Sequence, residues 1–152
     1  MKKKKIHKVI GRRDIIDLPE LEIFDIPCKI DTGAYTSAIH CREIQLYTDQ
    51  EGAQALSFRL LDPSHNAYND LTFSTKKFRR AAIKSSFGEV IYRYIIVTRI
   101  QIFGESYKTE FSLADRKSMR YPLLLGRKLL KNNFLVDVDK SNLSFKNKRR
   151  SS

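Results

Sequence analysis

The segment Asp31-Thr32-Gly33-Ala34 combines residue types that could do hydrolytic chemistry, because it places an acid at the end of a predicted strand. Two carboxylates that share one proton can activate a water molecule and protonate the carbonyl oxygen of an amide. The hydroxyl of Thr32 could tie two such acid loops together, and Gly33 lets a backbone N–H approach the carboxylate. The segment therefore indicates one catalytic acid, Asp31, supported by Thr32 and Gly33, although Asp-Thr-Gly alone is also typical of an ordinary turn.

A second segment of interest lies 93 residues further along, counted from Gly33 to Gly126. Tyr121–Leu125 is an apolar strand candidate that ends in Gly126-Arg127 and runs into Arg127–Asn133, a stretch rich in good helix formers. This is the one short helix that the sequence predicts.

The remaining elements that must position these residues are predicted to be strands, because they are rich in β-branched and aromatic residues and are separated by turn residues. Phe103-Gly104-Glu105-Ser106 and Ser85-Ser86-Phe87-Gly88 are hairpin candidates. Val90–Val97 is apolar at almost every position, which predicts a strand buried on both faces. The pattern favours a mainly β, closed or sandwich-like domain. Its predicted strands are Ile26–Asp31, Thr36–Tyr47, Leu56–Leu61, Leu71–Ser74, Glu89–Phe103, Ser106–Ala114, Tyr121–Leu125, Phe134–Val138 and Leu143–Phe145.

Positive charge is concentrated at the two ends of the chain. The 152 residues contain 29 Lys and Arg against 17 Asp and Glu, and eight of the cations lie in the runs Lys2–Lys5 and Lys146–Arg150. Removing these eight charges from the net charge of +12 leaves +4 for the body. We therefore expect a basic tail over 1–8, one domain over 9–145 and a second basic tail over 146–152. Such tails could attract nucleic acid, but solubilising ends are the interpretation we favour.

The cysteine and histidine inventory gives little support for a metal site. Cys28, His40 and Cys41 could converge, but adjacent residues on one strand point to opposite faces, so no metal and no other cofactor is expected. Two cysteines do not form a disulfide framework, and neither a signal peptide nor a membrane span is predicted. These features favour a cytoplasmic location.

The combined motifs resemble the bacterial retropepsin-like aspartic peptidases labelled ATP-dependent zinc proteases. The likeness covers roughly Ile10 to Ser141 and the motifs keep the family's order. It implies a retropepsin-like acid protease barrel in which Asp31 is the catalytic aspartate. The matching segments are Asp31–Ala34, Thr36–His40, Ser85–Gly88, Asp115–Met119, Leu124–Leu130 and Phe134–Asp137.

The resemblance also implies roles for residues outside the acid. In retropepsins a strand like Tyr121–Leu125 passes beside the catalytic loop, so Leu125, Gly126 and Arg127 are expected to support the site. The hairpin around Ser85–Gly88 is the candidate for a substrate-covering flap, although an ordinary hairpin tip explains it equally well. The chain departs from the family's commoner pattern at Tyr35 and Cys41. Substrate contacts are expected from Ala34, Ser85, Ser86, Gly88 and Arg116.

One acid per chain has a consequence for assembly, because the chemistry requires two. A C2 homodimer that brings two copies of Asp31 together is the simplest solution, while a monomer would need Asp115, Asp137 or Asp139 as its second acid.

We therefore expect an aspartic-type peptidase that hydrolyses peptide or isopeptide bonds of a peptide or protein substrate. By family resemblance, it could trim the products of ATP-grasp amino-acid ligases. The alternatives are a non-catalytic peptide-binding or protein-binding domain on the same scaffold and, more weakly, a metal-dependent hydrolase.

Overall fold

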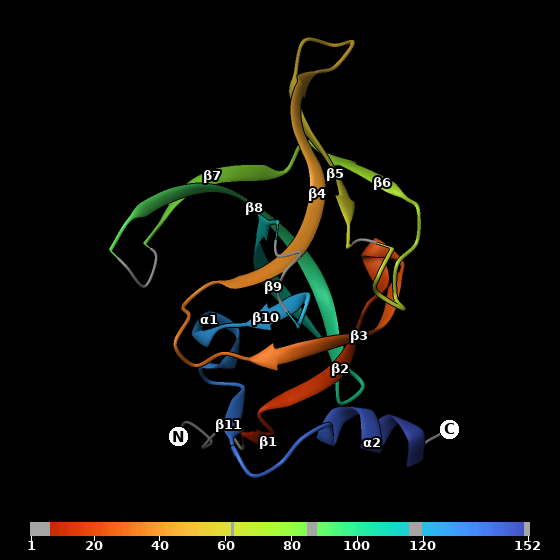
Figure 1. Ribbon diagram of the computed structural model, residues 1–152, viewed down its shortest axis with the longest axis vertical. Helices are drawn as coiled ribbons and strands as arrows, with labels where there is room; N and C mark the ends of the chain where they lie inside the picture. The colour runs from red at the N-terminus through yellow and green to blue at the C-terminus, as the bar shows by residue number, and fades with distance from the viewer. Residues whose placement is uncertain (1–6, 62, 85–87, 116–119, 151–152) are drawn as a thin grey trace, which may run out of the picture.

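The computed structural model describes residues 7–61, 63–84, 88–115 and 120–150. Over these ranges the chain is mainly β, with one turn of 3-10 helix and two short α-helices (Figure 1). In chain order the elements are β1 Lys8–Ile10, β2 Arg13–Leu18, η1 Pro19–Leu21, β3 Ile23–Ile30, β4 Ser37–Thr48, β5 Gln54–Leu60, β6 Thr72–Thr75, β7 Phe78–Lys84, β8 Val90–Ile102, β9 Glu105–Ala114, β10 Leu123–Leu125, α1 Arg127–Leu130, β11 Phe134–Val136 and α2 Leu143–Arg150.

The main sheet closes on itself into a barrel. Its strands follow the order β10-β3-β2-β8-β9-β4-β5-β6, and β10 pairs with β4 as well as with β3. The ring therefore runs from β10 through β3, β2, β8, β9 and β4 back to β10, which leaves no open edge in that part of the sheet. The predicted mainly β barrel is confirmed.

Two arms extend from the barrel. The long hairpin β4–β5 projects at the top of Figure 1, and the hairpin β7–β8 projects to the left. A third hairpin joins β8 to β9 through Phe103 and Gly104, as predicted, and both residues have positive φ values, of 53° and 72°. That pair of angles suits a two-residue turn matching the twist of the flanking strands.

The barrel interior is filled with aliphatic and aromatic side chains. Phe111, Ile39 and Ile100 are almost completely buried there, Phe58 on β5 belongs to the same buried cluster, and the burial of apolar area is the main source of stability. On β8 the inward positions alternate with exposed ones in the second half of the strand, where Ile96, Ile100 and Ile102 are buried and Val97 is exposed.

The prediction that Val90–Val97 is buried on both faces is wrong. Val90 and Tyr92 are each 58% exposed, because residues 90–94 of β8 leave the barrel and pair only with β7 in the projecting hairpin, and pairing with β9 begins at Ile95. An apolar run can thus belong to a central strand or to a protruding arm, and periodicity alone does not separate the two.

The prediction that Leu143–Phe145 is a strand is also wrong, because these residues begin α2. The carboxylate of Asp14, on β2, accepts the backbone N–H groups of Ser144 at 3.0 Å and Phe145 at 3.1 Å. An acid at this place satisfies N–H groups that the first helical turn leaves without a partner. The capping residue lies 130 positions earlier, so the local sequence does not reveal it.

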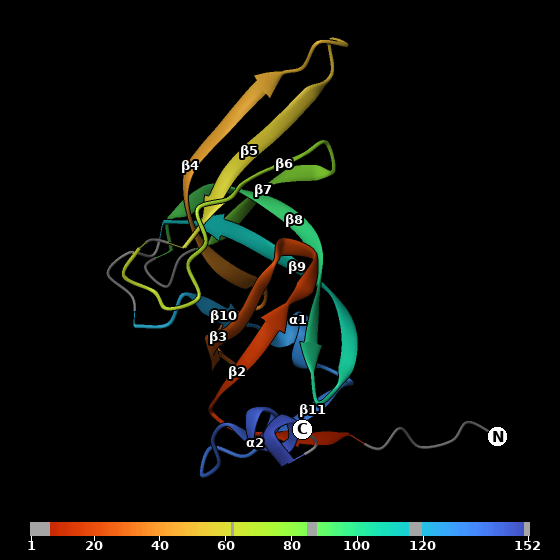
Figure 2. The ribbon, with the colours of Figure 1, turned by 90° about the vertical axis from the view of Figure 1, so that its right-hand side faces the viewer.

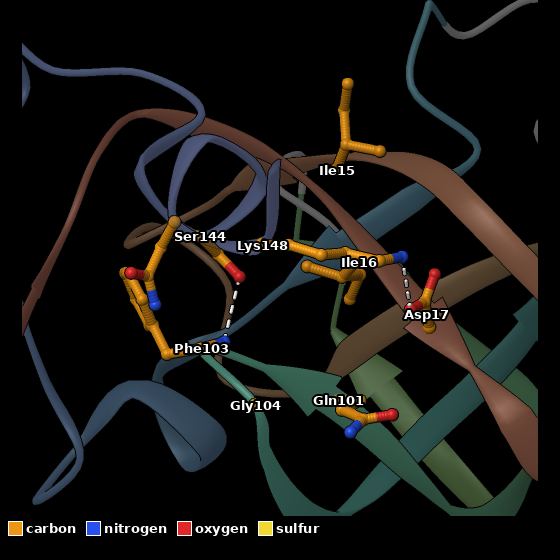
Figure 3. Close-up of a pocket in the computed structure, with 9 residues that line it drawn as sticks. Ile15, Ile16, Asp17, Gln101, Phe103, Gly104, Ser144 and Lys148 are labelled. Atoms are coloured by element: carbon orange, nitrogen blue, oxygen red, sulfur yellow. Dashed lines mark hydrogen bonds and ion pairs between the residues drawn. The ribbon is translucent and has the colours of Figure 1, made fainter. Parts of the chain in front are cut away.

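The basic segment predicted as a tail continues this helix up to Arg150. Lys148 donates to the carboxylates of Asp17 at 2.8 Å and Asp25 at 3.1 Å. The Ser144 hydroxyl accepts the N–H of Phe103 at 2.8 Å, and Figure 3 shows this bond together with the one from Lys148 to Asp17. These contacts attach α2 to β2 and to the β8–β9 turn. Between them lies a cavity of about 360 Å³. α2 itself lies at the lower end of the molecule in Figure 1 and in Figure 2.

Other boundaries differ less. The structure adds β1, β2 and β7, which the sequence did not predict, and β3 begins at Ile23 instead of Ile26. The predicted helix is confirmed but is shorter, Arg127–Leu130. Within the described ranges, no helix is long and apolar enough to span a bilayer.

Candidate active site around Asp31

Asp31 directly follows β3 and begins the loop that leads into β4. β10 is parallel to β3 and antiparallel to β4, so it runs between the two strands that this loop joins. The N–H of Asp31 donates to the carbonyl oxygen of Leu125 at 2.9 Å. This hydrogen bond to the last residue of β10 fixes the position of Asp31 at the end of β3.

The loop passes over Gly126 at very short range. A Cβ at Gly126 would lie 2.7 Å from the carbonyl oxygen of Tyr35 and 2.9 Å from that of Ala34. These two oxygens accept the N–H groups of Lys128 at 2.9 Å and Arg127 at 2.8 Å, in the first turn of α1. Only a residue without a side chain allows the loop to come close enough to bind the helix in this way.

Ser37 adds a further contact beneath the loop, and the sequence analysis did not identify it as a site residue. Its buried hydroxyl accepts the N–H of Gly126 at 3.0 Å, and its carbonyl oxygen accepts the hydroxyl of Ser112 at 3.4 Å. A serine at the start of a strand has no local feature that reveals such a role. Its function depends on β10 lying alongside.

The Asp31 carboxylate lies at the accessible end of this arrangement. One of its oxygens accepts the N–H of Gly33 at 3.1 Å, while Thr32 and Gly33 are exposed and Asp31 itself is half-buried. A Cβ at Gly33 would stand 3.3 Å from the same oxygen, so glycine suits this position. The acid is therefore oriented by its own loop and remains open to a second molecule.

Arg127 closes the loop from the side. Its guanidinium donates to the carbonyl oxygen of Thr32 at 3.0 Å and lies 5.8 Å from the ring centroid of Tyr35. The structure thus brings Asp31, Thr32, Gly33 and Ala34 together with Leu125, Gly126 and Arg127. Tyr35, where the chain departs from the family's commoner pattern, takes part in the same cluster.

The other predicted substrate contacts belong to different segments. Ser85, Ser86 and Arg116 lie outside the described residues. Gly88 is exposed, with a φ of 84°, and precedes β8 in the projecting arm. In Figure 1 this arm and the Asp31 loop both extend to the left of the barrel. Whether the hairpin acts as a flap stays a prediction.

The acids considered as partners for Asp31 within one chain belong to other parts of the barrel. Asp115 lies 3.7 Å from the buried ring of His40, and the backbone N–H of His40 donates to the carbonyl oxygen of Pro122 at 2.7 Å. Pro122 precedes Leu125 by three positions on the β10 segment, which places it roughly 10 Å along the strand from the Asp31 loop. Asp137 accepts the N–H of Asp139 in the turn after β11, below the barrel in Figure 1.

Burial keeps both thiols protonated. It raises the pKa of the Cys28 thiol well above its usual range and that of Cys41 to about 12. Metals bind the deprotonated thiolate, so neither cysteine is prepared as a ligand. Among the described residues, no group of three or more His, Cys, Asp or Glu side chains could hold a metal ion.

The pKa of Glu110, a carboxylate next to the site, is lowered, whereas the pKa values of the two thiols are raised. Lys128 and Arg79 both bind Glu110, Arg79 at 3.0 Å, and these hydrogen bonds hold the pKa of Glu110 below its usual value. Lys128 is also the residue whose N–H binds the Asp31 loop. Glu110 is consequently an ionised neighbour of the site at neutral pH.

Comparison with known proteins gives a match to one family and to one solved fold. Residues 9–147 match the model of a RimB-like family, described as "Retropepsin-like aspartic endopeptidase RimB". The fold is similar to the crystal structure of Lpg0085 from Legionella pneumophila, a protein of unknown function (DUF785). That match has a TM-score of 0.73 and 22% identity, and it covers 91% of this chain and 99% of the other.

Two curated relatives carry a different name. A "Probable alpha-L-glutamate ligase" from Shewanella halifaxensis is 36% identical over 133 residues, which is 88% of this chain and 29% of the relative. A protein of the same name from Desulfotalea psychrophila is 28% identical over 130 residues, or 86% of this chain and 28% of the relative. The chain thus spans less than a third of these relatives.

Proposed function

The chain belongs to the RimB-like family of retropepsin-like aspartic endopeptidases, and from this premise we propose that two copies combine their Asp31 carboxylates into one hydrolytic site. The observation that carries the proposal is the Asp31 loop, which is fixed from below by β10 and α1 and open above. Each chain supplies one such loop. A two-fold axis through the open side would bring two of them face to face.

The paired carboxylates would share one proton, because two like charges at close range do not both ionise. The ionised carboxylate takes a proton from water, and the water oxygen attacks the carbonyl carbon of the substrate amide. The protonated carboxylate gives its proton to the carbonyl oxygen. When the tetrahedral intermediate collapses, one of its two hydroxyl groups returns a proton to the ionised carboxylate, the C–N bond breaks, and the nitrogen leaves with the proton that the other carboxylate took from water. The N–H of Gly33 holds its Asp31 oxygen throughout.

We further propose that the substrate is a peptide or isopeptide bond of the kind that a glutamate ligase makes. The support is that two relatives in which this domain recurs are named probable alpha-L-glutamate ligases. A hydrolase beside such an activity would trim what the ligase adds. The cytoplasm is the compartment in which we expect this to happen.

The test is hydrolysis of glutamate-extended peptides by the purified full chain, followed by mass spectrometry. Asp31→Asn keeps an oxygen that can accept the Gly33 N–H, so the fold should be retained while the rate falls by about 10³-fold or more. Asp70→Asn is the matched control, because Asp70 is exposed and pairs with Arg59 away from the loop. Cleavage by the Asp31 variant at the parent rate would refute the proposal.

The same assay separates the other sources of a second acid. If the acid came from the same chain, Asp115→Asn, Asp137→Asn or Asp139→Asn would abolish cleavage as thoroughly as the Asp31 variant. A chain that only binds peptides would release no product in any of these experiments.

A further inference from the structure

A groove on the outer face of β7, β8 and β9 carries more positive charge than its own carboxylates neutralise. Two adjoining cavities of about 480 and 320 Å³ share Val97, Lys108 and Glu110 as lining residues, so they form one continuous groove. Its cations come from β7, β8, β9 and α1. The basic groove is defined by Lys77, Arg79, Arg99, Lys108 and Lys128, with Val97 as its exposed apolar floor.

Both acids in the groove are already bound. Glu20 accepts the N–H of Arg99 at 2.7 Å and the hydroxyl of Thr98 at 3.3 Å. Glu110 lies between Arg79 and Lys128. Within the described part of the chain, the side-chain cations of Lys77, Arg99 and Lys108 form no ion pair with a carboxylate, and all three residues are exposed. The groove therefore has unused capacity for negative charge.

The side chain of Glu110 shows how the groove binds a carboxylate group. Two cations from different elements, Arg79 on β7 and Lys128 on α1, converge on its single carboxylate. Arg99 and Lys108 are paired directly across β8 and β9, one same-face step from the Val97–Glu110 pair. That step is about 7 Å, which is also the spacing of alternate side chains in an extended peptide. One carboxylate of a bound extended peptide could thus reach Arg99 and Lys108. The carboxylate two residues further along that peptide would then lie near Lys128.

We propose that the basic groove is a second binding site, for a carboxylate-rich peptide segment, separate from the Asp31 carboxylate. The idea that the segment belongs to the substrate rests on the proposed function, but the binding itself does not require hydrolysis. One end of the groove is lined by Ser37 and Lys128, which hold the Asp31 loop from below. A peptide anchored in the groove is consequently held next to the loop of the same chain.

The lining of the groove favours an acidic peptide over nucleic acid. Single-stranded nucleic acid binds through aromatic platforms on which bases stack. Among the described residues that line the groove, Phe78 is the one aromatic residue, and its ring packs edge-on against Tyr94 at an interplanar angle of 78°. Val97, which is 49% exposed, offers instead an aliphatic surface for the stems of glutamate side chains.

The experiment measures the fluorescence anisotropy of labelled hexa-L-glutamate with the full-length Asp31→Asn chain, which binds without turnover. R99E/K108E should weaken binding by about tenfold, because two attractive contacts become repulsive. K140E/K146E makes the same change in net charge at exposed positions away from the groove and should change binding by less than about twofold. Thermal unfolding of both variants shows that each is folded.

Three results would overturn the proposal. Hexa-L-glutamate could fail to bind the Asp31→Asn chain at low salt, or K140E/K146E could weaken it as much as R99E/K108E does. Hexathymidylate could also bind more tightly than hexa-L-glutamate and lose that affinity in R99E/K108E, which would make the groove a nucleic-acid site. If the parent chain binds hexa-L-glutamate in the groove but cleaves no peptide, the proposed function is contradicted and the proposal of a binding site in the groove is supported.

Discussion

The Asp31 loop and the basic groove meet at Ser37 and Lys128, yet they are held by different kinds of interaction. The loop is fixed by backbone N–H and carbonyl groups of β10 and α1 and by a crossing at Gly126 that has no room for a side chain. The groove is lined by exposed side chains, joined where they pair by ion pairs such as Lys128–Glu110. Chemistry requires an acid held within a fraction of an ångström. Recognition of a flexible acidic chain tolerates movement, so exposed charges are sufficient.

Among the substitutions that test this difference between loop and groove, Gly126→Ala should have the largest effect on stability and cleavage. Its Cβ would meet two backbone oxygens of the loop at 2.7 and 2.9 Å, and backbone atoms cannot swing aside. We expect a loss of about 2–3 kcal/mol in the free energy of unfolding, together with loss of cleavage. Urea unfolding and the hydrolysis assay measure the two effects.

Gly52→Ala is the matched control for this change. Gly52 has a φ of 83°, but nothing lies within 4 Å of its added Cβ. The substitution should cost about 1 kcal/mol through the backbone alone and leave cleavage unchanged. If both variants cleaved like the parent, the close crossing would not be what positions Asp31.

The smallest effect is expected from Glu110→Gln. The hydrogen bonds from Lys128 and Arg79 lower the pKa of Glu110 in the folded chain, so the unfolded chain takes up this proton first as the pH falls. The stabilisation is complete above the ordinary glutamate value of 4.5 and disappears as the pH falls through the lower folded value. Because both cations are about half exposed, it should not exceed about 1 kcal/mol at pH 7.

Denaturant unfolding of the parent and of Glu110→Gln at pH 7 and pH 3 measures this difference. The gap between the two proteins should be smaller at the lower pH, and 1 M salt should reduce it at pH 7. A gap as large at pH 3 as at pH 7 would mean that Glu110 acts through packing, and the contrast with the loop would be lost.

Much of the fold could be predicted because many of its strands and turns are determined by the local sequence. The turn at Phe103–Gly104 was predicted from Gly104, which readily adopts a positive φ, and the helix after Gly126 from residues that are good helix formers. The support of the site by Leu125, Gly126 and Arg127 followed from the family resemblance, and the structure brings these residues to the Asp31 loop. In these elements the residue types of a short segment are sufficient to predict its conformation.

The remainder depends on contacts between distant residues. Ser37 supports the loop only because β10 lies beside β4, and α2 is a helix because Asp14 caps it from β2. The outer half of β8 has a sequence as apolar as a central strand, yet it projects into solvent with β7. The partners of Ser37 and of α2 lie 89 and 130 residues away, so no local window contains the information. The outer half of β8 differs from the inner half in having no pairing with β9, and its own residue types do not show this.

The central claim is that two chains contribute one carboxylate each, and mixing the parent with Asp31→Asn tests it most directly. If the subunits exchange at random and a mixed dimer is inactive, an equal mixture should show about a quarter of the cleavage rate of the parent at the same total concentration. A rate of about one half, as expected for chains that act independently, would contradict the shared site.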